Sequence, residues 1–598
     1  MKQFFKFTFA SMLGFILASF IGVFIFGAIF SAIVSSSQQP SIPTVASNSL
    51  LHIKLENRIV DQPTNNPFEN FDFGKFEDKT PLSLEQIVGS IQRAKANDNI
   101  KGIYLDIQNL QANLASTEEI RNALIDFKSS GKFILSYNEF IGQNEYYLCS
   151  VADEIYLNPA GGMTFKGLSA QLMFFKDALE RLEIDMQVVR HGKFKSAIEP
   201  FTRNEMSEAN KYQISEWVNS IWDHQLKGIS TSRSIDVEKL NELADNLAIR
   251  KTEDAVNYGL IDGLKYEDEI WSMLSTKVDL EPDERPKTIS LSRFGKVRRP
   301  KVDSSTTVPY MRSSKNRIAV IYAEGEIVSG ESRDGAMGSK TIADALKDAR
   351  EDDRVKAIVF RVNSPGGSAL ASDVIWREAK LAKAEKPLVV SMGDYAASGG
   401  YYISSPANKI FAESTTITGS IGVFGLIPNM QGLFNNKLGI HIDKVNTNTY
   451  SDGINALRPM EKTEHDAIKE MIEKVYDDFT KKVAEGRGMT QTEVDSIGQG
   501  RVWTGAMAIE VGLVDEIGGL QTAINEAIQL AQIENYKILE LPAQEDPFEK
   551  MLKELSQGAS IHIFGDNYGI AEKYYSNIKR VISSEGIYTR LPVDIVFN

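Results

Sequence analysis

The stretch PLVVSMGDYAASGGYYIS, residues 387–404, combines an apolar strand pattern with a serine at the start of a helix. Residues 387–392 are apolar and rich in β-branched side chains, which predicts a strand. Residues 393–397 then form a tight connection, and Ser398 lies exposed at the start of a helix. Neighbouring glycines let a substrate backbone approach, and free helix N–H groups favour negative charge on an attacked carbonyl group. The position suits a nucleophile, although the stretch taken alone favours an ordinary capping serine, because caps are common.

A second strand-to-helix connection lies upstream, in VKAIVFRVNSPGGSALASDVI, which begins at Val355. Residues 355–362 predict an apolar strand, residues 364–368 a turn with two glycines, and a helix follows. At the carboxyl edge of a parallel sheet, neighbouring connections lie side by side. The Gly-Gly turn and the Ser398 connection could therefore face each other across a cleft, which would offer an oxyanion hole.

The composition bounds the class of protein. The chain has 598 residues, of which 42% are hydrophobic, enough for more than one buried core. A net charge of -14 without a basic block argues against nucleic acid as a partner. The single cysteine, Cys149, excludes an internal disulfide and is expected to be a small buried residue. No Cys/His cluster has zinc-ligand spacing, so neither a metal nor another cofactor is expected.

The N-terminus holds an uncharged run from Phe7 to Val34. This exceeds the roughly 20 residues that a helix needs to cross a bilayer, so the run predicts a single uncleaved transmembrane anchor. Cleavage near Ser31 is the alternative. Lys2 and Lys6 precede the run, and the positive-inside rule then places the rest of the chain outside the cytoplasm.

The body of the chain contains an internal repeat. DNIKGIYLDI, residues 98–107, matches DRVKAIVFRV, residues 353–362, with an offset of 255 residues, and the same offset aligns Tyr146 with Tyr401. Each half alternates strand and helix patterns, which predicts an α/β fold with two tandem parallel-sheet domains.

Proline, serine and charged residues gather between Asp279 and Asn316 and mark the boundary between the halves. The C-terminal extension receives no role beyond packing. The predicted segments are residues 1–45 as anchor and spacer, 46–285 as the first domain, 286–315 as a linker, 316–542 as the second domain and 543–598 as the extension.

The repeat indicates where the two halves differ chemically. The first half has Gln143 at the position of Ser398 and Gln111-Ala112 at the position of the Gly-Gly pair, so it lacks both the nucleophile and the glycine turn. The six histidines form no Ser/His/Asp signature, which leaves a lysine as the candidate base for Ser398.

The stretch VVRHGKFKSAIEPF, residues 188–201, offers Lys195 or, by spacing alone, Lys193. Lys195 aligns with Tyr450 in the second half, so a lysine from one half and a serine from the other could share one site. A lysine has an ordinary pKa near 10.4 and serves as a base only when burial lowers that pKa. Taken alone, the pattern favours a solvated surface lysine.

Four motifs together resemble the signal peptide peptidase A family, also called protease IV, in its long, duplicated, membrane-anchored form. They are Gly-Lys-Phe-Lys-Ser-Ala at 192–197, Asn-Ser-Pro-Gly-Gly-Ser at 363–368, Tyr-Ala-Ala-Ser-Gly-Gly-Tyr at 395–401 and Thr-Gly-Ser-Ile-Gly at 418–422. The resemblance implies a ClpP/crotonase-like fold for both domains and a serine/lysine dyad split between them. It also implies a homotetramer.

The resemblance assigns roles by motif. Ser398 would be the nucleophile, and Lys195 rather than Lys193 the general base, because the family's lysine directly precedes the Ser-Ala pair. Ser420 would hydrogen-bond the lysine; without the family it reads as a turn residue. Oxyanion donors would be the backbone N–H groups of Gly399 and of either Gly366 or Gly367. Asp394 and Tyr395 add polarity before the serine motif, a departure that bears on specificity.

The expected function is that of a membrane-anchored serine endopeptidase that degrades remnant signal peptides. The resemblance and the anchor imply hydrophobic peptide substrates and a single-pass protein of the bacterial inner membrane, with the catalytic domains on the periplasmic side. A catalytically idle membrane scaffold is the alternative, and the complete set of motif residues argues against it. Acyl-CoA chemistry on a crotonase-like fold is disfavoured outside the cytoplasm.

Overall fold

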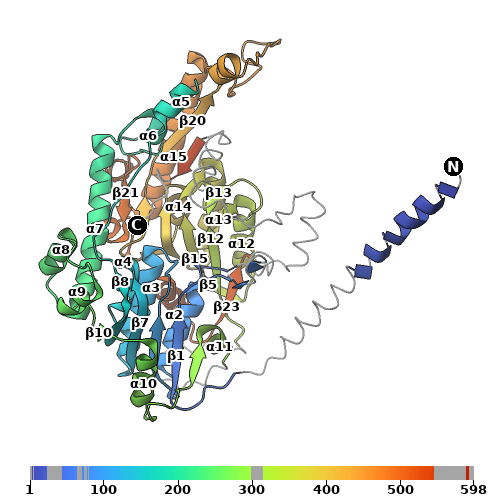
Figure 1. Ribbon diagram of the computed structural model, residues 1–598. Helices are drawn as coiled ribbons and strands as arrows, with labels where there is room; N and C mark the ends of the chain where they lie inside the picture. The colour runs from blue at the N-terminus through green and yellow to red at the C-terminus, as the bar shows by residue number, and fades with distance from the viewer. Residues whose placement is uncertain are drawn as a thin grey trace.

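Two parallel sheets, one from each half of the chain, organise the molecule (Figure 1). The structure is a computed structural model. It describes residues 3–4, 6–15, 17–19, 21–22, 43–63, 71–72, 77–78, 80–297, 314–333, 335–543 and 587–590. The predicted α/β class with two tandem domains is confirmed.

The sheet of the first half has six strands, and every neighbouring pair is parallel. In spatial order they are β10 (Gly263–Leu264), β8 (Glu154–Met163), β7 (Phe133–Ile141), β6 (Ile100–Asp106), β1 (Ser49–Lys54) and β11 (Thr288–Ser290). Its helices are α2 (Leu84–Lys95), α3 (Leu114–Lys128), α4 (Gln143–Cys149), α5 (Lys176–Arg181), α6 (Glu199–Thr202), α7 (Glu208–Arg233), α8 (Val237–Asp245), α9 (Thr252–Asn257), α10 (Glu267–Lys277) and α11 (Leu291–Gly295). Short paired strands are β2 (Ile59–Val60) with β5 (Leu82–Ser83) and β3 (Phe71–Asp72) with β4 (Glu77–Asp78).

The sheet of the second half has eight strands and is parallel except at the pair of β19 and β21. Its main path is β21 (Val502–Thr504), β19 (Ile417–Gly419), β17 (Leu388–Ala397), β15 (Val355–Ser364), β12 (Arg317–Glu324) and β23 (Lys537–Leu541). Off this path, β18 (Lys409–Ala412) pairs with β17, and β22 (Glu516–Ile517) pairs with β18. Its helices are α12 (Ser339–Glu351), α13 (Ala369–Glu385), α14 (Gly399–Ser404), the π-helical turn η1 (Leu433–Lys437), α15 (Lys462–Arg487), α16 (Gln491–Ile497), α17 (Gly505–Glu510) and α18 (Leu520–Ala531).

Strand β15 shows why this sheet lies inside the domain. Ile358 and Phe360 belong to one buried cluster, whereas Ala357 and Val359 belong to another on the opposite face. A strand covered on both faces reads as a continuous apolar run, as this one does. Helix α13 belongs to the first of these clusters and α18 to the second, so helices cover both faces.

The repeat is preserved at the level of single hydrogen bonds. The Tyr146 hydroxyl group donates to the Leu260 carbonyl oxygen at 2.8 Å, and the Tyr401 hydroxyl group donates to the Leu513 carbonyl oxygen at 2.9 Å. Each bond fixes the helix after the third parallel strand of its half. The two halves therefore fold alike where their sequences match. Cys149 is the last residue of α4 and is buried as expected. Burial raises the pKa of its thiol to about 12.

A third sheet joins the two halves. Its order is β14 (Ala336–Gly338), β13 (Glu326–Val328), β16 (Gly366–Ser368), β24 (Ile587–Arg590), β20 (Val423–Asn429) and β9 (Asp185–His191). Strand β9 comes from the first half and pairs antiparallel with β20 over its whole length. This pairing brings the residues that follow β9 close to the residues that precede β20.

Three local predictions are corrected. Residues 393–397 continue strand β17 instead of forming a connection, because β17 pairs there with β15 and β19. Residues 366–368 form strand β16 instead of a turn, paired with β13 and β24. The C-terminal extension, for which no role beyond packing was predicted, contributes β24 to the third sheet.

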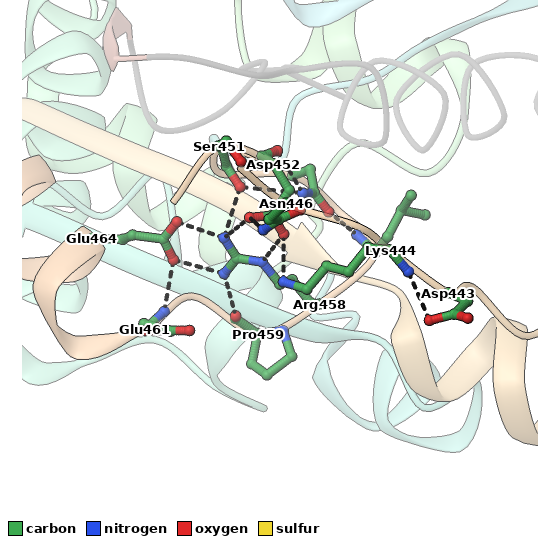
Figure 2. A network of polar contacts seen from close by, with 12 residues as sticks. Asp443, Lys444, Asn446, Ser451, Asp452, Arg458, Pro459, Glu461 and Glu464 are labelled. Atoms are coloured by element: carbon green, nitrogen blue, oxygen red, sulfur yellow. Dashed lines mark hydrogen bonds and ion pairs between the residues drawn. The ribbon is translucent and has the colours of Figure 1, made fainter. Parts of the chain in front are cut away.

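One arginine fixes the segment between β20 and α15, which extends away from the two main sheets (Figure 1). Figure 2 shows Arg458 between Asp452 and Glu464. The guanidinium group donates to Asp452 Oδ2 at 2.7 Å and to Glu464 Oε1 at 2.6 Å. Glu464 also accepts the backbone N–H of Glu461 at the start of α15. Arg458 lowers the pKa of both carboxyl groups, so the network is a set of charged pairs that holds this segment to the helix.

Among the helices of the described residues, none is long and apolar enough to cross a membrane. Part of the predicted anchor, from residue 23 onward, lies outside the described residues, as do most of the predicted linker and of the C-terminal extension.

Candidate active site

Ser398 lies at the junction of β17 and α14 and is fully buried, so the prediction of an exposed serine was wrong. Its backbone has φ 56° and ψ -113°, a conformation that non-glycine residues rarely adopt. Its N–H group donates to the Gly419 carbonyl oxygen at 2.7 Å. The strand and the helix thus hold Ser398 in a strained position between them.

Lys195 follows strand β9 and reaches Ser398 from the other half of the chain. Its side chain is fully buried, and Nζ lies 2.8 Å from Ser398 Oγ. Lys193 is exposed, with its Nζ over the Phe194 ring. The expectation of a solvated lysine therefore fits Lys193 and was wrong for Lys195.

Ser420 completes the contacts of the lysine. Lys195 Nζ lies 3.0 Å from Ser420 Oγ and 3.2 Å from the Ser420 carbonyl oxygen. A neutral amine has two N–H donors and one lone pair. If the two donors serve the two Ser420 oxygens, the lone pair remains for the Ser398 hydroxyl proton. This is the hydrogen bond that a general base makes before it removes a proton.

Burial lowers the pKa of Lys195 well below its ordinary value of 10.5. Desolvation is the cause: a buried amine loses the water that stabilises its charged form. The lysine is therefore available in its neutral form at a much lower pH than a surface lysine. A base of this kind can activate a serine, whose hydroxyl group is a weak nucleophile by itself.

Close backbone packing holds Lys195 in place. The Phe194 N–H donates to the Gln499 carbonyl oxygen at 2.8 Å, and a Cβ at Gly500 would lie 2.6 Å from the Lys195 backbone nitrogen. A Cβ at Gly422 would lie 3.2 Å from Lys195 Cδ. Sequence reasoning missed Gly500, because no motif marks it and its partner is some three hundred residues away in the chain.

The three predicted oxyanion glycines lie at the start of α14 and in strand β16. Gly399 is the first residue of α14, where a helix leaves its N–H groups without intrahelical acceptors. The Gly366 N–H donates to Ser364 Oγ at 3.1 Å, and a Cβ at Gly367 would lie 2.1 Å from the Ile327 carbonyl oxygen. Gly367 must therefore be glycine for β16 to pair with β13.

The first half carries Gln143 in place of the serine. Gln143, which aligns with Ser398, accepts the backbone N–H groups of Lys166 and Gly167 with its Oε1 at 3.0 and 2.9 Å. Those residues align with the segment just after Ser420. The glutamine thus bonds to the backbone of the segment that corresponds to the residues after Ser420.

Known proteins resemble both halves of this chain. Peptidase family S49 matches residues 126–281 and 380–534, one match in each half. The chain belongs to peptidase family S49, a family of serine peptidases. The predicted family resemblance and the tandem arrangement are thereby confirmed.

The S49 relatives cover most of the chain. Protease 4 of Haemophilus influenzae is 38% identical, over 75% of this chain and 73% of its own length. Protease 4 of Salmonella typhi is 36% identical, over 82% and 79%. The chloroplastic serine protease SPPA of Arabidopsis thaliana is 34% identical, over 76% and 66%.

Gly500→Ala is expected to lower kcat about 100-fold, because a new Cβ would push on the Lys195 backbone, and displacement of a reacting group by about 1 Å has an effect of that order. Gly439→Ala is the matched control: both glycines have positive φ, but a Cβ at Gly439 meets nothing within 4 Å. Steady-state kinetics and thermal unfolding of both variants check this. Equal kinetic losses in the two variants would mean that backbone strain, and not contact with Lys195, is responsible.

The pH profile of kcat/KM is expected to rise through the lowered pKa of Lys195 and to level off above it, because the neutral amine is the active form. The midpoint of this limb should lie well below 10.5, with Lys193→Met leaving it in place. The measurement is kcat/KM of both proteins across the pH range in which they stay folded. A limb centred near 10.5 would contradict a desolvated base.

Proposed function

We propose that this S49 member is a membrane-anchored serine endopeptidase that degrades remnant signal peptides, with Ser398 as nucleophile and Lys195 as general base. The observation that carries the proposal is the 2.8 Å separation of Lys195 Nζ and Ser398 Oγ in a buried setting that lowers the lysine pKa. The ClpP/crotonase-like fold implied by the sequence motifs is part of this proposal.

Acylation begins when neutral Lys195 removes the hydroxyl proton of Ser398 while Oγ attacks the peptide carbonyl carbon. The negative charge moves to the carbonyl oxygen, where backbone N–H groups of Gly399 and of Gly366 or Gly367 hold it. The ammonium of Lys195 then returns its proton to the departing amine, which leaves an ester on Ser398.

Deacylation repeats these steps with water. Lys195 removes a proton from the water molecule that attacks the ester, and the same N–H groups hold the oxyanion. The carboxylic acid product leaves, and Ser398 regains its proton. Side chains, backbone groups and water supply the whole reaction.

An apolar substrate is favoured by the surroundings of the lysine. Side chains from β9, β20 and the segment after Lys195 form one apolar cluster: Ala197, Ile198, Phe424, Leu426, Met186, Val188 and Phe201. The Phe424 ring centre lies 6.0 Å from Lys195 Nζ. An anchor over residues 7–34 would hold this site at the periplasmic face of a bacterial inner membrane, where cleaved signal peptides remain, and we propose the homotetramer of the long family form.

An idle membrane scaffold does not explain the buried lysine. Removing water from a lysine costs several kcal/mol when no carboxylate compensates for it. Desolvation alone is the cause of the lowered Lys195 pKa, so the fold sustains that cost at this position. A scaffold gains nothing from such a lysine beside a strained serine, whereas a peptidase requires it.

The full chain in detergent micelles tests the proposal with fluorogenic peptides. We expect turnover of apolar, signal-like peptides, little turnover of peptides of equal length with charged side chains, and no turnover by Ser398→Ala. An inert parent protein on a varied apolar panel would favour the scaffold. Turnover that persists in Ser398→Ala would place the nucleophile elsewhere.

A further inference from the structure

Helix α7 of the first half lies against strand β21 of the second half (Figure 1). Its buried apolar side chains share one cluster with Ile417, Val502 and Ala397, the residue that precedes the nucleophile. The polar side chain of Gln213 belongs to the same helix and is only 1% exposed. Burying an amide is unfavourable unless it forms hydrogen bonds, so the partners of Gln213 indicate what it does here.

The amide nitrogen of Gln213 contacts the residues on both sides of Lys195. Nε2 lies 3.0 Å from the Phe194 carbonyl oxygen and 3.1 Å from Ser196 Oγ. Asn210 Oδ1, one turn earlier on α7, is a third acceptor at 3.0 Å. An amide nitrogen has two donors, which these three acceptors share. The amide thereby fixes the chain immediately before and after the lysine.

The amide oxygen of Gln213 contacts the second half. Oε1 accepts the Val502 N–H at 3.3 Å. Val502 lies opposite Gly419 in the antiparallel pair of β21 and β19. The Gly419 carbonyl oxygen in turn accepts the Ser398 N–H at 2.7 Å. One planar amide thus connects the segment that carries Lys195 to the strands that fix the backbone of Ser398.

We propose that Gln213 is a positioning residue that aligns Lys195 with Ser398 across the contact between the two halves. This proposal rests on the proposed peptidase function, because it concerns the same dyad. A lysine has a long, flexible side chain, so its amine stays within reach of Ser398 Oγ only while its backbone is held. The bonds of the Gln213 amide hold that backbone and close the contact around the lysine segment, which keeps water from the amine.

Gln213→Met removes the donors and the acceptor and keeps the approximate length of the side chain. We expect kcat to fall about 100-fold with KM within about twofold of the parent, because a displacement of a reacting group by about 1 Å has an effect of that order. Gln225→Met is the matched control: Gln225 is an equally buried glutamine of α7, and its Oε1 has no hydrogen-bond partner among the described residues. Steady-state kinetics of the full chain in detergent micelles measure both variants. Equal kcat values for the two would overturn the proposal.

The pH profile of kcat/KM distinguishes positioning from a general loss of stability. When the contact loosens, water reaches the Lys195 amine and stabilises its charged form, so the rising limb of Gln213→Met should move to higher pH. Arg190, which donates to the Lys195 carbonyl oxygen at 3.3 Å, is unchanged, and both substitutions are neutral, so no nearby charge differs. A lower melting temperature with an unmoved limb would mean a structural role only and would overturn the proposal.

Gln213→Asn provides a second test if the methionine variant does not fold. Asparagine keeps the amide but is one methylene shorter, so it cannot span the Phe194 carbonyl oxygen and the Val502 N–H together. We expect a fall in kcat of about tenfold, with the limb moved in the same direction as in Gln213→Met. Parent values of both quantities in Gln213→Asn would contradict a positioning role.

Labelling by a serine-reactive phosphonate separates this proposal from the proposed function, because it reports activation of Ser398 without cleavage of a peptide. Labelling of Gln213→Met is expected to be about 100-fold slower than labelling of Gln225→Met. That result together with a parent protein that cleaves no peptide would leave the positioning role in place and reject the peptidase. Equal labelling rates in the two variants, with a parent that cleaves apolar peptides, would reject the positioning role and leave the peptidase in place.

Discussion

Lys195→Met is expected to lower kcat/KM by at least about 10⁴-fold, because Ser398 would lose the base that activates it. Lys195 Nζ is the group that lies 2.8 Å from Ser398 Oγ, with Ser420 Oγ on its other side at 3.0 Å. Methionine is similar in length and apolar, so it fills the buried position without a group that needs water. The measurement is steady-state turnover of an apolar fluorogenic peptide by the full chain.

Stability and a nearby lysine serve as controls for this variant. The melting temperature of Lys195→Met should equal or exceed that of the parent, because the cost of burying an amine disappears. Lys193→Met, which alters an exposed lysine of the same segment, should keep turnover within about twofold of the parent, as surface changes usually do. If Lys195→Met stays within about tenfold of the parent, below the range of general-base effects, another group serves Ser398.

Arg361→Met is expected to lower the free energy of unfolding by about 3–5 kcal/mol, because it leaves buried carboxylates without their cation. Arg361 of β15 is buried and lies 2.9 Å from Asp61 and 2.6 Å from Glu119, which both belong to the first half. Glu119 also accepts the backbone N–H of Leu520 at 3.0 Å. Chemical denaturation measures this loss of stability. The substitution should also loosen the contact between the halves.

An exposed arginine of the same half is the matched control. Arg354→Met removes a pair with Asp352 at the surface, where such pairs contribute little, so its denaturation curve should overlay that of the parent. Neutralising both acids, with Asp61→Asn and Glu119→Gln, should restore part of the stability of Arg361→Met. A loss in Arg361→Met no larger than in Arg354→Met would mean that water reaches the buried carboxylates.

The sequence pattern predicted the elements whose signals are local. The apolar runs before Val362 and Met392 gave strands because both faces of β15 and β17 are buried. The prediction for residues 393–397 was wrong because glycine and aspartate are typical of turns, and pairing with distant β19 overrides that preference. The buried state of Ser398 also depends on segments distant in the chain, which a local pattern does not contain.

Two sources of information predicted the site: the internal repeat and the family resemblance. The repeat indicated that the halves could share one site, but only the family resemblance separated Lys195 from Lys193. In the structure, burial separates them. Gly500 stayed hidden because its partner is distant in sequence. Asp394, expected to bear on specificity, is buried and accepts the Ser116 N–H at 3.0 Å and the Ser116 hydroxyl at 2.8 Å, so it binds the other half of the chain.

Asp394 carries a pKa raised by burial, although the bonds from Ser116 oppose that shift. Its position near the end of β17, four residues before Ser398, couples the contact between the halves to the strand that leads into Ser398. The contact between Lys195 and Ser398 of the two halves thus has a second contact between the halves close to it in sequence. One half cannot hold the site without the other.

The most direct test of a dyad shared by two halves is the rate at which a serine-reactive phosphonate modifies the full chain, followed by intact-mass measurement. We predict one adduct per parent chain, located at Ser398, no adduct in Ser398→Ala, and an adduct in Lys195→Met that forms more slowly by at least about 100-fold, the lower range of general-base effects. An adduct that forms in Lys195→Met at the parent rate would contradict activation of Ser398 by Lys195, and an adduct that persists in Ser398→Ala would contradict the nucleophile itself.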